Sequence, residues 1–211
     1  MAAENFVYVY GSGLYVNVTN RCTNKCVFCI RDRAAGVGGS DLWLTREPQA
    51  GEINVAVDEA FKEQVFRELV FCGFGEPLLR PDVIIEVCRH VRAGYPEVSI
   101  RINTNGLANL VHSPRDIAAD LKGLVDVMSI SLNAGDAASY IAVSHPAPGL
   151  AEKAFDAVIS FAREARANGA SVIFTVVAGV PGAEIDLAAT RRIAADVGAT
   201  LRIREYQESF D

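Results

Sequence analysis

The sequence has no long hydrophobic run and no excess of basic residues. No stretch approaches the roughly 20 consecutive apolar residues that a membrane-spanning helix needs. The first ten residues, MAAENFVYVY, lack the basic and apolar segments of a signal peptide. The net charge is −6, whereas general nucleic-acid binders usually present a basic face. We therefore expect a cytoplasmic protein without a membrane segment and without general nucleic-acid binding.

Cysteine and histidine are also scarce, with five cysteines and three histidines in 211 residues. An odd number of cysteines does not suit a disulfide framework, and a chain of this length can build a core without one. Half of the residues are hydrophobic, and no linker or low-complexity segment interrupts the chain. We expect a single domain over residues 1–211, with its thiols reduced.

Strand-like and helix-like segments alternate along the chain. This alternation predicts parallel strands joined by right-handed crossovers. A long loop over residues 20–56 follows the first strand. The predicted strands are 14–19, 70–74, 98–103, 125–133, 171–177 and 200–206, and the predicted helices are 58–69, 81–94, 113–123, 150–169 and 183–198.

Polar side chains occupy one face of several predicted strands. In the third strand, Ser99, Arg101 and Asn103 alternate with Ile100 and Ile102. A closed eight-stranded barrel fills its interior with apolar side chains, so a polar interior favours a more open structure. We predict an α/β fold, a partial (β/α)6 TIM-like barrel with its apolar faces against the helices. The alternative, a solvent-facing antiparallel sheet, does not suit the intervening helices.

Three of the five cysteines lie within eight residues, in the segment CTNKCVFC from Cys22 to Cys29. Structural zinc sites usually have four ligands, and no histidine lies at a suitable spacing. Ferredoxins also supply four cysteines for each cubane cluster. Three thiolates on one loop can hold a [4Fe–4S] cluster and leave its fourth iron open for chemistry. Cys72 and Cys88 lie in apolar patterns and are expected to pack in the core.

A second motif, Gly-Phe-Gly-Glu-Pro at residues 73–77, directly follows the second predicted strand. Together the two motifs resemble the radical S-adenosylmethionine (radical SAM) enzymes, over essentially the whole chain. The resemblance implies a partial (β/α)6 barrel and a [4Fe–4S] cluster held by Cys22, Cys26 and Cys29. It also implies that SAM binds the open iron and is cleaved reductively to a 5′-deoxyadenosyl radical, which abstracts a hydrogen atom from the substrate.

The resemblance further implies residues that bind SAM. Phe28 matches the aromatic position beside the adenine, and residues 73–77 match the Gly-Gly-Glu-Pro element at the SAM amino group, with Phe74 in place of a glycine. Arg202 resembles an arginine on the sixth strand that meets the SAM carboxylate. The expected cofactor-binding residues are Phe28, Gly73, Phe74, Gly75, Glu76, Thr104, Ser131, Asn133 and Arg202.

Further arginines predict an anionic substrate. Arg101 and Arg204 share the polar faces of the predicted strands, and Arg31 and Arg33 follow the cysteine motif. Guanidinium groups bind carboxylate and phosphate through paired hydrogen bonds. We expect an anionic small molecule or nucleotide-like substrate bound by Asn17, Arg101 and Arg204, with Arg101 also a candidate catalytic residue.

The alternative is that these two arginines are paired with carboxylates. The carboxylates considered are Glu76, Glu205 and Asp126.

Within the family, the nearest resemblance is to the small TatD-associated subgroup. It rests on Leu-Tyr-x-Asn-x-Thr-Asn-Arg-Cys (14–22), Cys-Ile-Arg (29–31), Leu-Trp-Leu (42–44) and Leu-Arg-Ile-Arg (201–204). The implied partners are a low-potential electron donor of the flavodoxin or ferredoxin type and, by association, a TatD-like nuclease. No further cysteine cluster follows the sixth strand, so no auxiliary cluster domain is expected. A reaction like that of 7-carboxy-7-deazaguanine synthase or of an activase is an alternative within the class.

Two other classes of protein fit the three cysteines. One is a non-catalytic iron–sulfur protein for electron transfer or redox sensing, and the other is a zinc-binding structural module. The loop at residues 30–56 contains the sole tryptophan, Trp43. We expect this loop to be a lid or a partner surface, or else to be packed onto the barrel by Trp43.

Overall fold

The structure is a computed structural model that describes residues 6–34, 36–37 and 40–207. Its main sheet has seven strands in the order β1-β2-β5-β6-β7-β8-β9. All neighbours from β2 to β9 pair in parallel, whereas β1 pairs antiparallel with β2. The strands are β1 (Val7–Tyr10), β2 (Gly13–Val16), β5 (Glu68–Phe71), β6 (Ser99–Thr104), β7 (Val127–Ser131), β8 (Ser171–Ala178) and β9 (Thr200–Glu205).

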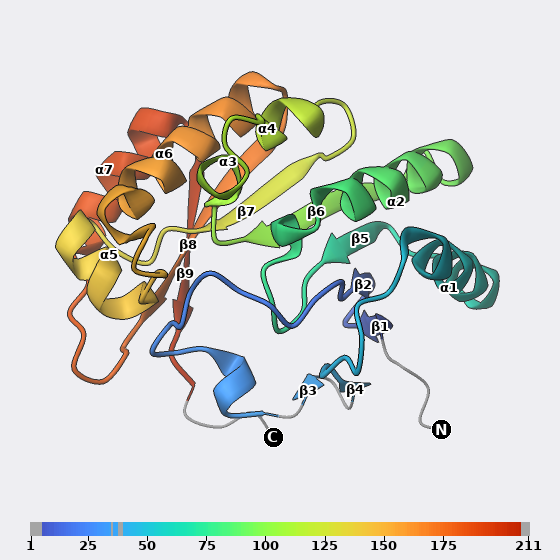
Figure 1. Ribbon diagram of the computed structural model, residues 1–211, viewed down its shortest axis with the longest axis horizontal. Coiled ribbons are helices and arrows are strands. Elements are labelled where there is room, and N and C mark those ends of the chain that lie inside the picture. The colour runs from blue at the N-terminus through green and yellow to red at the C-terminus, as the bar shows by residue number, and fades with distance from the viewer. Residues whose placement is uncertain (1–5, 35, 38–39, 208–211) are drawn as a thin grey trace.

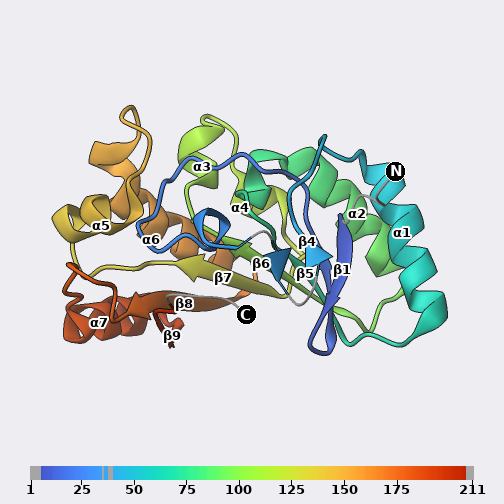
Figure 2. The same cartoon turned by 90° about the horizontal axis from the view of Figure 1, so that it is seen from below.

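Helices connect the parallel strands along one face of this sheet. Figure 1 shows them as an outer layer, and Figure 2 shows the segment that follows β2 crossing the opposite, open side toward α5. β1 and β9 are the two edges of the sheet, so the barrel is open and the predicted partial (β/α)6 barrel is confirmed. The helices are α1 (Ala50–Glu63), α2 (Pro81–Gly94), α3 (Ala108–Val111), α4 (Ile117–Asp120), α5 (Ala137–Ser144), α6 (Ala151–Ala167) and α7 (Leu187–Val197).

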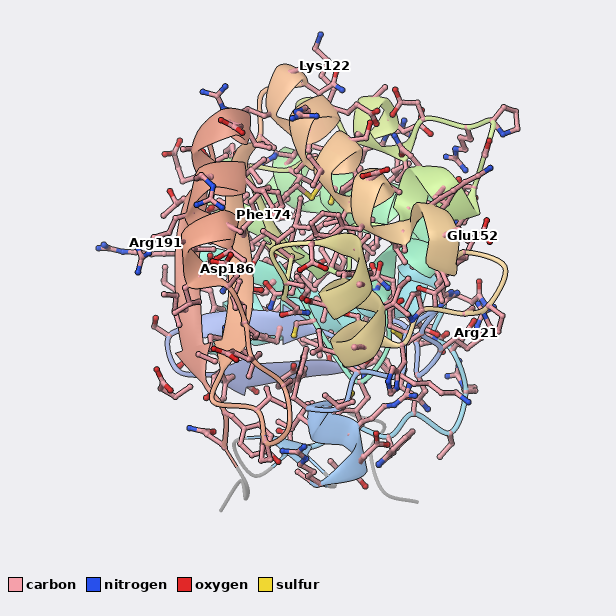
Figure 3. The ribbon with its side chains drawn as sticks, turned by 90° about the vertical axis from the view of Figure 1, so that its left-hand side faces the viewer. Arg21, Lys122, Glu152, Phe174, Asp186 and Arg191 are labelled. Atoms are coloured by element: carbon pink, nitrogen blue, oxygen red, sulfur yellow. The ribbon has the colours of Figure 1, made fainter. Side chains whose placement is uncertain are left out.

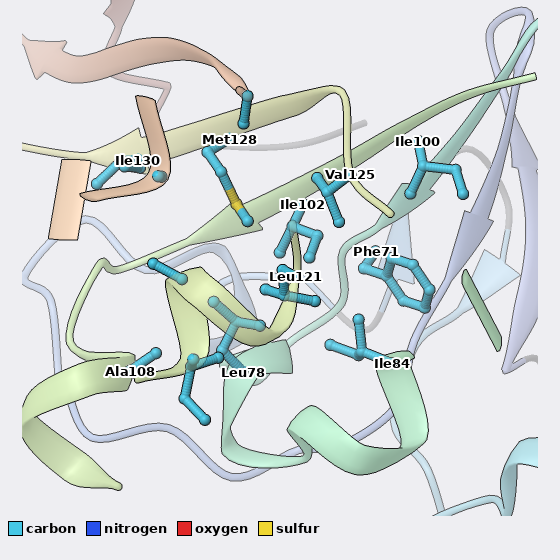
Figure 4. Close-up of a cluster of buried hydrophobic side chains, with 14 of the residues drawn as sticks. Phe71, Leu78, Ile84, Ile100, Ile102, Ala108, Leu121, Val125, Met128 and Ile130 are labelled. Atoms are coloured by element: carbon cyan, nitrogen blue, oxygen red, sulfur yellow. The ribbon is translucent and has the colours of Figure 1, made fainter. Parts of the chain in front are cut away.

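The apolar faces of the strands form the core with these helices. Ile100 and Ile102 of β6 are fully buried against Ile84 of α2 and its neighbours (Figure 4). Figure 3 shows Phe174 of β8 inside this layer, while Arg191 of α7 points outward. Burying a side chain of this size contributes about 1.5–3 kcal/mol. The predicted alternation is confirmed, and the polar faces form what we call the concave face, on the side away from the helices.

The predicted boundaries of the first helix and of the strand that follows it were wrong. The helix expected at residues 58–69 lies at Ala50–Glu63, so the preceding loop ends at Gln49. Its first turn is stabilised by the Glu52 carboxylate, which accepts a 2.8 Å hydrogen bond from the Gln49 N–H. The following strand begins at Glu68 and ends at Phe71, where residues 70–74 were expected. Part of the predicted loop, residues 35 and 38–39, lies outside the described residues.

Other short elements also differ from the prediction. The helix expected at 113–123 is limited to Ile117–Asp120, preceded by the separate turn of α3. The helix α5 and the strand β1 were not predicted. Two short 3-10 turns, Ile30–Asp32 and Pro77–Leu79, and a small hairpin of β3 (Gly36–Val37) and β4 (Ser40–Asp41) complete the described elements. Among the described residues, no helix is both long enough and apolar enough to cross a membrane.

Candidate active site at the strand ends

The cysteine motif and the Gly-Glu-Pro motif meet where β2 and β5 end. The backbone N–H of Glu76 donates a 2.7 Å hydrogen bond to the carbonyl of Arg21, the residue before the first cysteine. A Cβ added at Gly75 would lie 2.3 Å from the Thr19 carbonyl oxygen, and one added at Gly73 would lie 2.0 Å from Asn17 Oδ1. Both glycines are therefore required for the two segments to cross at this distance.

The loop of the three cysteines (residues 22–29, the cysteine loop) is held by α5 and the turn that follows it. The N–H groups of Lys25 and Val27 donate to carbonyls within residues 143–145, at 3.0–3.2 Å. The Thr23 carbonyl accepts a 2.8 Å hydrogen bond from the Ala147 N–H. These bonds hold the loop backbone on both sides of Cys26.

The three thiols are partly buried and lie close enough to influence one another. Burial raises the pKa of Cys22 to about 11 and that of Cys26 to about 12, and it also raises the pKa of Cys29. The charges of Cys22 and Cys29 add to the rise at Cys26. Three neighbouring thiolates at this place therefore need positive charge nearby, such as bound iron would supply.

The thiols are not arranged as ligands of one ion. Within the described ranges, no three His, Cys, Asp or Glu side chains form a group that could hold a metal ion. A cluster of four irons offers a separate iron to each cysteine, so its ligands do not converge on a single point.

Glu76 is a buried carboxylate, with 5 % of its surface exposed. It accepts hydrogen bonds from the Leu78 N–H (3.0 Å), the Thr104 hydroxyl (2.7 Å) and the Asn105 N–H (2.6 Å). Burial raises its pKa to about 7, although these donors favour the ionised form. The side chain joins the end of β5 to the end of β6.

Thr104 and Asn105 complete this junction. The Thr104 hydroxyl also accepts a 3.1 Å hydrogen bond from the Gly106 N–H, so its donor and an acceptor position are both used internally. Asn105 donates 2.8 Å from Nδ2 to the Thr23 hydroxyl of the cysteine loop. Sequence reasoning missed Asn105, although it stands beside Thr104 in the motif Asn-Thr-Asn-Gly directly after β6.

Phe74 and Asn17 hold the long loop against the concave face. Phe74 is buried in a small apolar cluster with Tyr8 and Leu42, and its ring centroid lies 5.0 Å from that of Trp43. Asn17 donates a 2.7 Å hydrogen bond from Nδ2 to the Leu42 carbonyl. Its Oδ1 atom is buried without a partner among the described residues. The loop is thus packed onto the barrel, as one expectation had it, but mainly through the buried Leu42 and Leu44, whereas Trp43 is 47 % exposed.

Arg101 is already paired with a carboxylate. Its guanidinium makes two hydrogen bonds to Glu68, at 2.9 and 2.8 Å, and further bonds to Asn103 Oδ1 (3.1 Å) and the Tyr15 hydroxyl (3.4 Å). The partner is thus Glu68, which was not among the three carboxylates considered from the sequence. The role of Arg101 in substrate binding or catalysis stays a prediction.

The two arginines of β9 are differently placed. Arg202 and Arg204 are exposed on the concave face, and neither has a hydrogen-bond or ion-pair partner in the part of the chain that the structure describes. Arg204 and Arg101 act on Cys72, where they oppose the rise in the thiol pKa that burial causes. Cys72 therefore faces the concave side, and the expectation that it packs in the core was wrong. Cys88 does lie in the core.

Arg33 joins the cysteine loop to the last strand. It donates hydrogen bonds to the carbonyls of Val27 (2.8 Å) and Gln207 (3.0 Å), and its guanidinium lies 4.4 Å from the centre of the Tyr206 ring. Arg31 contacts Asp32 at 3.8 Å. Both side chains therefore have partners within the protein.

The remaining predicted cofactor residues come from the cysteine loop, the end of β7 and the segment after it. Phe28 and Ser131 are half-buried, on the cysteine loop and at the end of β7. Asn133 is buried with a φ of 55°, and its N–H donates to the Thr175 carbonyl at 3.2 Å. Their roles stay predictions.

Comparisons with known proteins agree with this arrangement. The chain is 28 % identical over 193 residues to the GTP 3′,8-cyclase of Erythrobacter litoralis, covering 88 % of this chain and 52 % of that protein. It is 31 % identical over 107 residues to a probable GTP 3′,8-cyclase of Methanothermobacter marburgensis, covering 51 % of this chain and 32 % of that one. This chain thus spans a third to a half of the curated relatives it matches.

Solved structures share the fold. Streptococcus suis SuiB bound to its precursor peptide SuiA matches with a TM-score of 0.68 at 14 % identity, over 96 % of this chain and 41 % of that one. The protein anSMEcpe with bound AdoMet matches with a TM-score of 0.65 at 13 % identity, over 92 % and 51 %. The family model of the Radical SAM superfamily matches residues 16–192. This chain belongs to the radical SAM superfamily.

Proposed function

We propose that this chain is a radical SAM enzyme in which Cys22, Cys26 and Cys29 bind a [4Fe–4S] cluster. The observation that carries the proposal is the meeting of three strand ends at the cysteine loop. Glu76 after β5 is hydrogen-bonded to Arg21, and Asn105 after β6 is hydrogen-bonded to Thr23. The carboxyl ends of parallel strands are where ligands bind in α/β proteins.

The donor set suits the cluster. Three thiols lie on one short loop whose backbone is pinned by α5, and they share a partly buried site. When bound, the cluster supplies the single electron that cleaves SAM. The chain contributes a fixed loop and partial exclusion of water, with Arg31 as a nearby positive charge that favours the thiolates of Cys22 and Cys29.

We assign the SAM contacts to residues of the cysteine loop, β7 and β9. Arg202 is an exposed guanidinium without a described partner, which suits the SAM carboxylate. Phe28 and Ser131 are half-buried and therefore partly accessible, and they suit the adenine and the ribose. Glu76 and Thr104 are buried and internally hydrogen-bonded, so their proposed part is to shape the 73–77 segment that receives the SAM amino group.

The substrate is proposed to be an anionic molecule held by Arg204. Arg101 is neutralised by Glu68, which leaves Arg204 as the better-placed cation of the concave face for this role. Because the curated relatives are GTP 3′,8-cyclases, a guanine nucleotide is the first substrate class to test. The relatives are longer than this chain, and their reaction comes to it only as part of this proposal.

Anaerobic reconstitution tests the enzyme against its alternatives. The enzyme should bind about four irons per chain, show a spectrum that changes on SAM addition, and form 5′-deoxyadenosine after reduction. Cys22→Ala should lose the cluster, whereas the matched variant Cys72→Ala, on the same concave face, should keep it. A cluster indifferent to SAM would indicate an electron-transfer or sensing protein, and a colourless zinc-loaded chain would indicate a structural module.

The finer expectations remain part of the proposal. Membership of the TatD-associated subgroup, a TatD-like nuclease partner and a flavodoxin- or ferredoxin-type electron donor rest on the sequence resemblance. The same holds for a single domain over residues 1–211 without an auxiliary cluster, and for a cytoplasmic location.

A further inference from the structure

We propose that Asn105 is a positioning residue that raises the reduction potential of the cluster by donating an N–H···S hydrogen bond to Cys22. The proposal rests on the assignment of Cys22 as a cluster ligand. The Asn105 Nδ2 atom lies 3.9 Å from the Cys22 sulfur and comes from a different strand end. The cysteine loop and the segment after β6, which are far apart in the sequence, thus meet at this sulfur.

The orientation of the Asn105 amide is fixed by its neighbours. Its Oδ1 atom accepts a 3.0 Å hydrogen bond from the Leu107 N–H, so the oxygen must face residue 107 and the nitrogen must face the cysteine loop. One Nδ2 hydrogen is used by the Thr23 hydroxyl at 2.8 Å. Among the described residues, the acceptor within reach of the second hydrogen is the Cys22 sulfur.

The backbone of Asn105 is held as firmly as its side chain. Its N–H donates to the buried Glu76 carboxylate at 2.6 Å, and 8 % of the residue surface is exposed. The side chain therefore has no alternative water-facing position within this geometry. A second donor, the Asn24 N–H, has its nitrogen 3.4 Å from the same sulfur, so Cys22 receives donors from its own loop and from the segment after β6.

Hydrogen bonds to cysteine sulfur affect an iron–sulfur cluster in a known direction. A donor stabilises the more negative, reduced state of the cluster and so raises its potential. Because the Asn105 amide is neutral and fixed, its loss should change the potential without changing the number of thiolate ligands. Its action is through Cys22, and no contact with SAM or substrate is needed.

The test compares Asn105→Ser with wild type and with Asn109→Ser, all as reconstituted full chains. Serine at position 105 can still accept from the Leu107 N–H but is too short to reach Cys22. Asn109 is the matched control because it also follows β6 and its amide bonds the carboxylates of Asp116 and Glu164 and two backbone N–H groups rather than a sulfur. Cluster reduction is followed by electron paramagnetic resonance during a redox titration, and iron content is measured for each variant.

We expect Asn105→Ser to bind as much iron as wild type but to show about a threefold lower ratio of reduced to oxidised cluster at a fixed potential. Asn109→Ser should titrate as wild type does. Equal potentials for wild type and Asn105→Ser, with full iron content, would overturn the proposal. If Asn105→Ser binds no iron, Asn105→Thr, which keeps an acceptor oxygen and adds no charge, is titrated in its place. Loss of iron in both variants, but not in Asn109→Ser, would also overturn a role in setting the potential. Wild-type protein that binds no cluster would instead reject the proposed function.

Discussion

The backbone N–H of Asn105 donates a 2.6 Å hydrogen bond to the buried carboxylate of Glu76, which joins the ends of two parallel strands. Burial raises the pKa of Glu76 from 4.5 to about 7. The folded protein therefore keeps a proton that the unfolded chain has released within this range. The contribution of Glu76 to the free energy of unfolding should fall as the pH rises from 4.5 to about 7, by at most about 1.4 kcal/mol per pH unit.

This pH dependence can be measured by urea unfolding of iron-free protein between about pH 5 and 8. Glu76→Gln removes the titrating group, so its stability should vary less with pH than that of wild type. The exposed Glu97→Gln variant serves as the control and should keep the wild-type profile. A profile of Glu76→Gln parallel to that of wild type would show that the Glu76 carboxyl is ionised throughout.

Replacing Gly75 with alanine should destabilise the site. The added Cβ would lie 2.3 Å from the Thr19 carbonyl oxygen and 2.5 Å from that of Arg21, both backbone atoms of the segment that joins β2 to the cysteine loop. We expect a loss of about 1–3 kcal/mol in the free energy of unfolding, together with weaker iron binding. The control is Gly51→Ala, since nothing lies within 4 Å of its added Cβ, and alanine there should stabilise α1 by up to about 1 kcal/mol. Similar losses in both variants would contradict the clash.

The pairing of Arg101 with Glu68 should be visible as coupling in a double-mutant cycle. Arg101→Leu leaves the Glu68 carboxylate without its partner, and because Glu68 is partly exposed the loss should be about 1–3 kcal/mol. Adding Glu68→Leu should recover part of that loss, as measured by chemical unfolding. Strictly additive effects would show that the pair does not contribute to stability.

Arg204 should contribute to the binding of an anionic ligand. If Arg204 holds the anionic substrate, Arg204→Leu should weaken binding of GTP, used as the probe, by about tenfold or more. Glu97→Leu, a change on the outer surface, is the control. Isothermal titration of reconstituted protein measures the affinities, and 5′-deoxyadenosine formed without substrate should be unchanged in Arg204→Leu. Equal loss of GTP binding and of this uncoupled SAM cleavage would reject the assignment.

Trp43 reports on the attachment of the long loop because it is the sole tryptophan. Asn20 bonds both backbone groups of Leu44, with Nδ2 2.7 Å from its oxygen and Oδ1 3.1 Å from its nitrogen. Asn20→Ser should release this segment and shift Trp43 emission to longer wavelength. Asn168→Ser, which removes an amide from the far end of α6, should leave the emission unchanged.

Much of the fold could be predicted because each parallel strand shows its two faces in the sequence. The helix Pro81–Gly94 was found at its full length, since proline and glycine mark its ends. The start of α1 was missed because Pro48 and Gly51 suggested a loop, whereas Gly51 is an exposed residue of the first helical turn. α5 was missed because its short, mostly apolar sequence has little amphipathic pattern.

The site could be predicted only where its residues form a recognisable sequence motif. The three cysteines and residues 73–77 were found from their spacing and neighbours. The pairing of Arg101 with Glu68 was missed because it joins two strands whose register the sequence does not reveal. Cys72 was misplaced because it follows the uniformly apolar run Leu69-Val70-Phe71, whose sequence shows no alternation to tell which face each side chain occupies.

The attachment of the cysteine loop to α5 has a consequence for how this protein can diverge. Lys25, Val27 and Thr23 are held there through main-chain atoms on both sides. Residues 143–145 accept through carbonyl oxygens, which every amino acid has, and any residue except proline can supply the N–H that Ala147 donates. These bonds therefore tolerate changes of side chain at 143–147, whereas the bond from Asn24 to the Tyr140 hydroxyl depends on both side chains. Distantly related proteins could therefore keep this backbone support with different residues at these positions. Comparison of their structures would reveal it where comparison of their sequences does not.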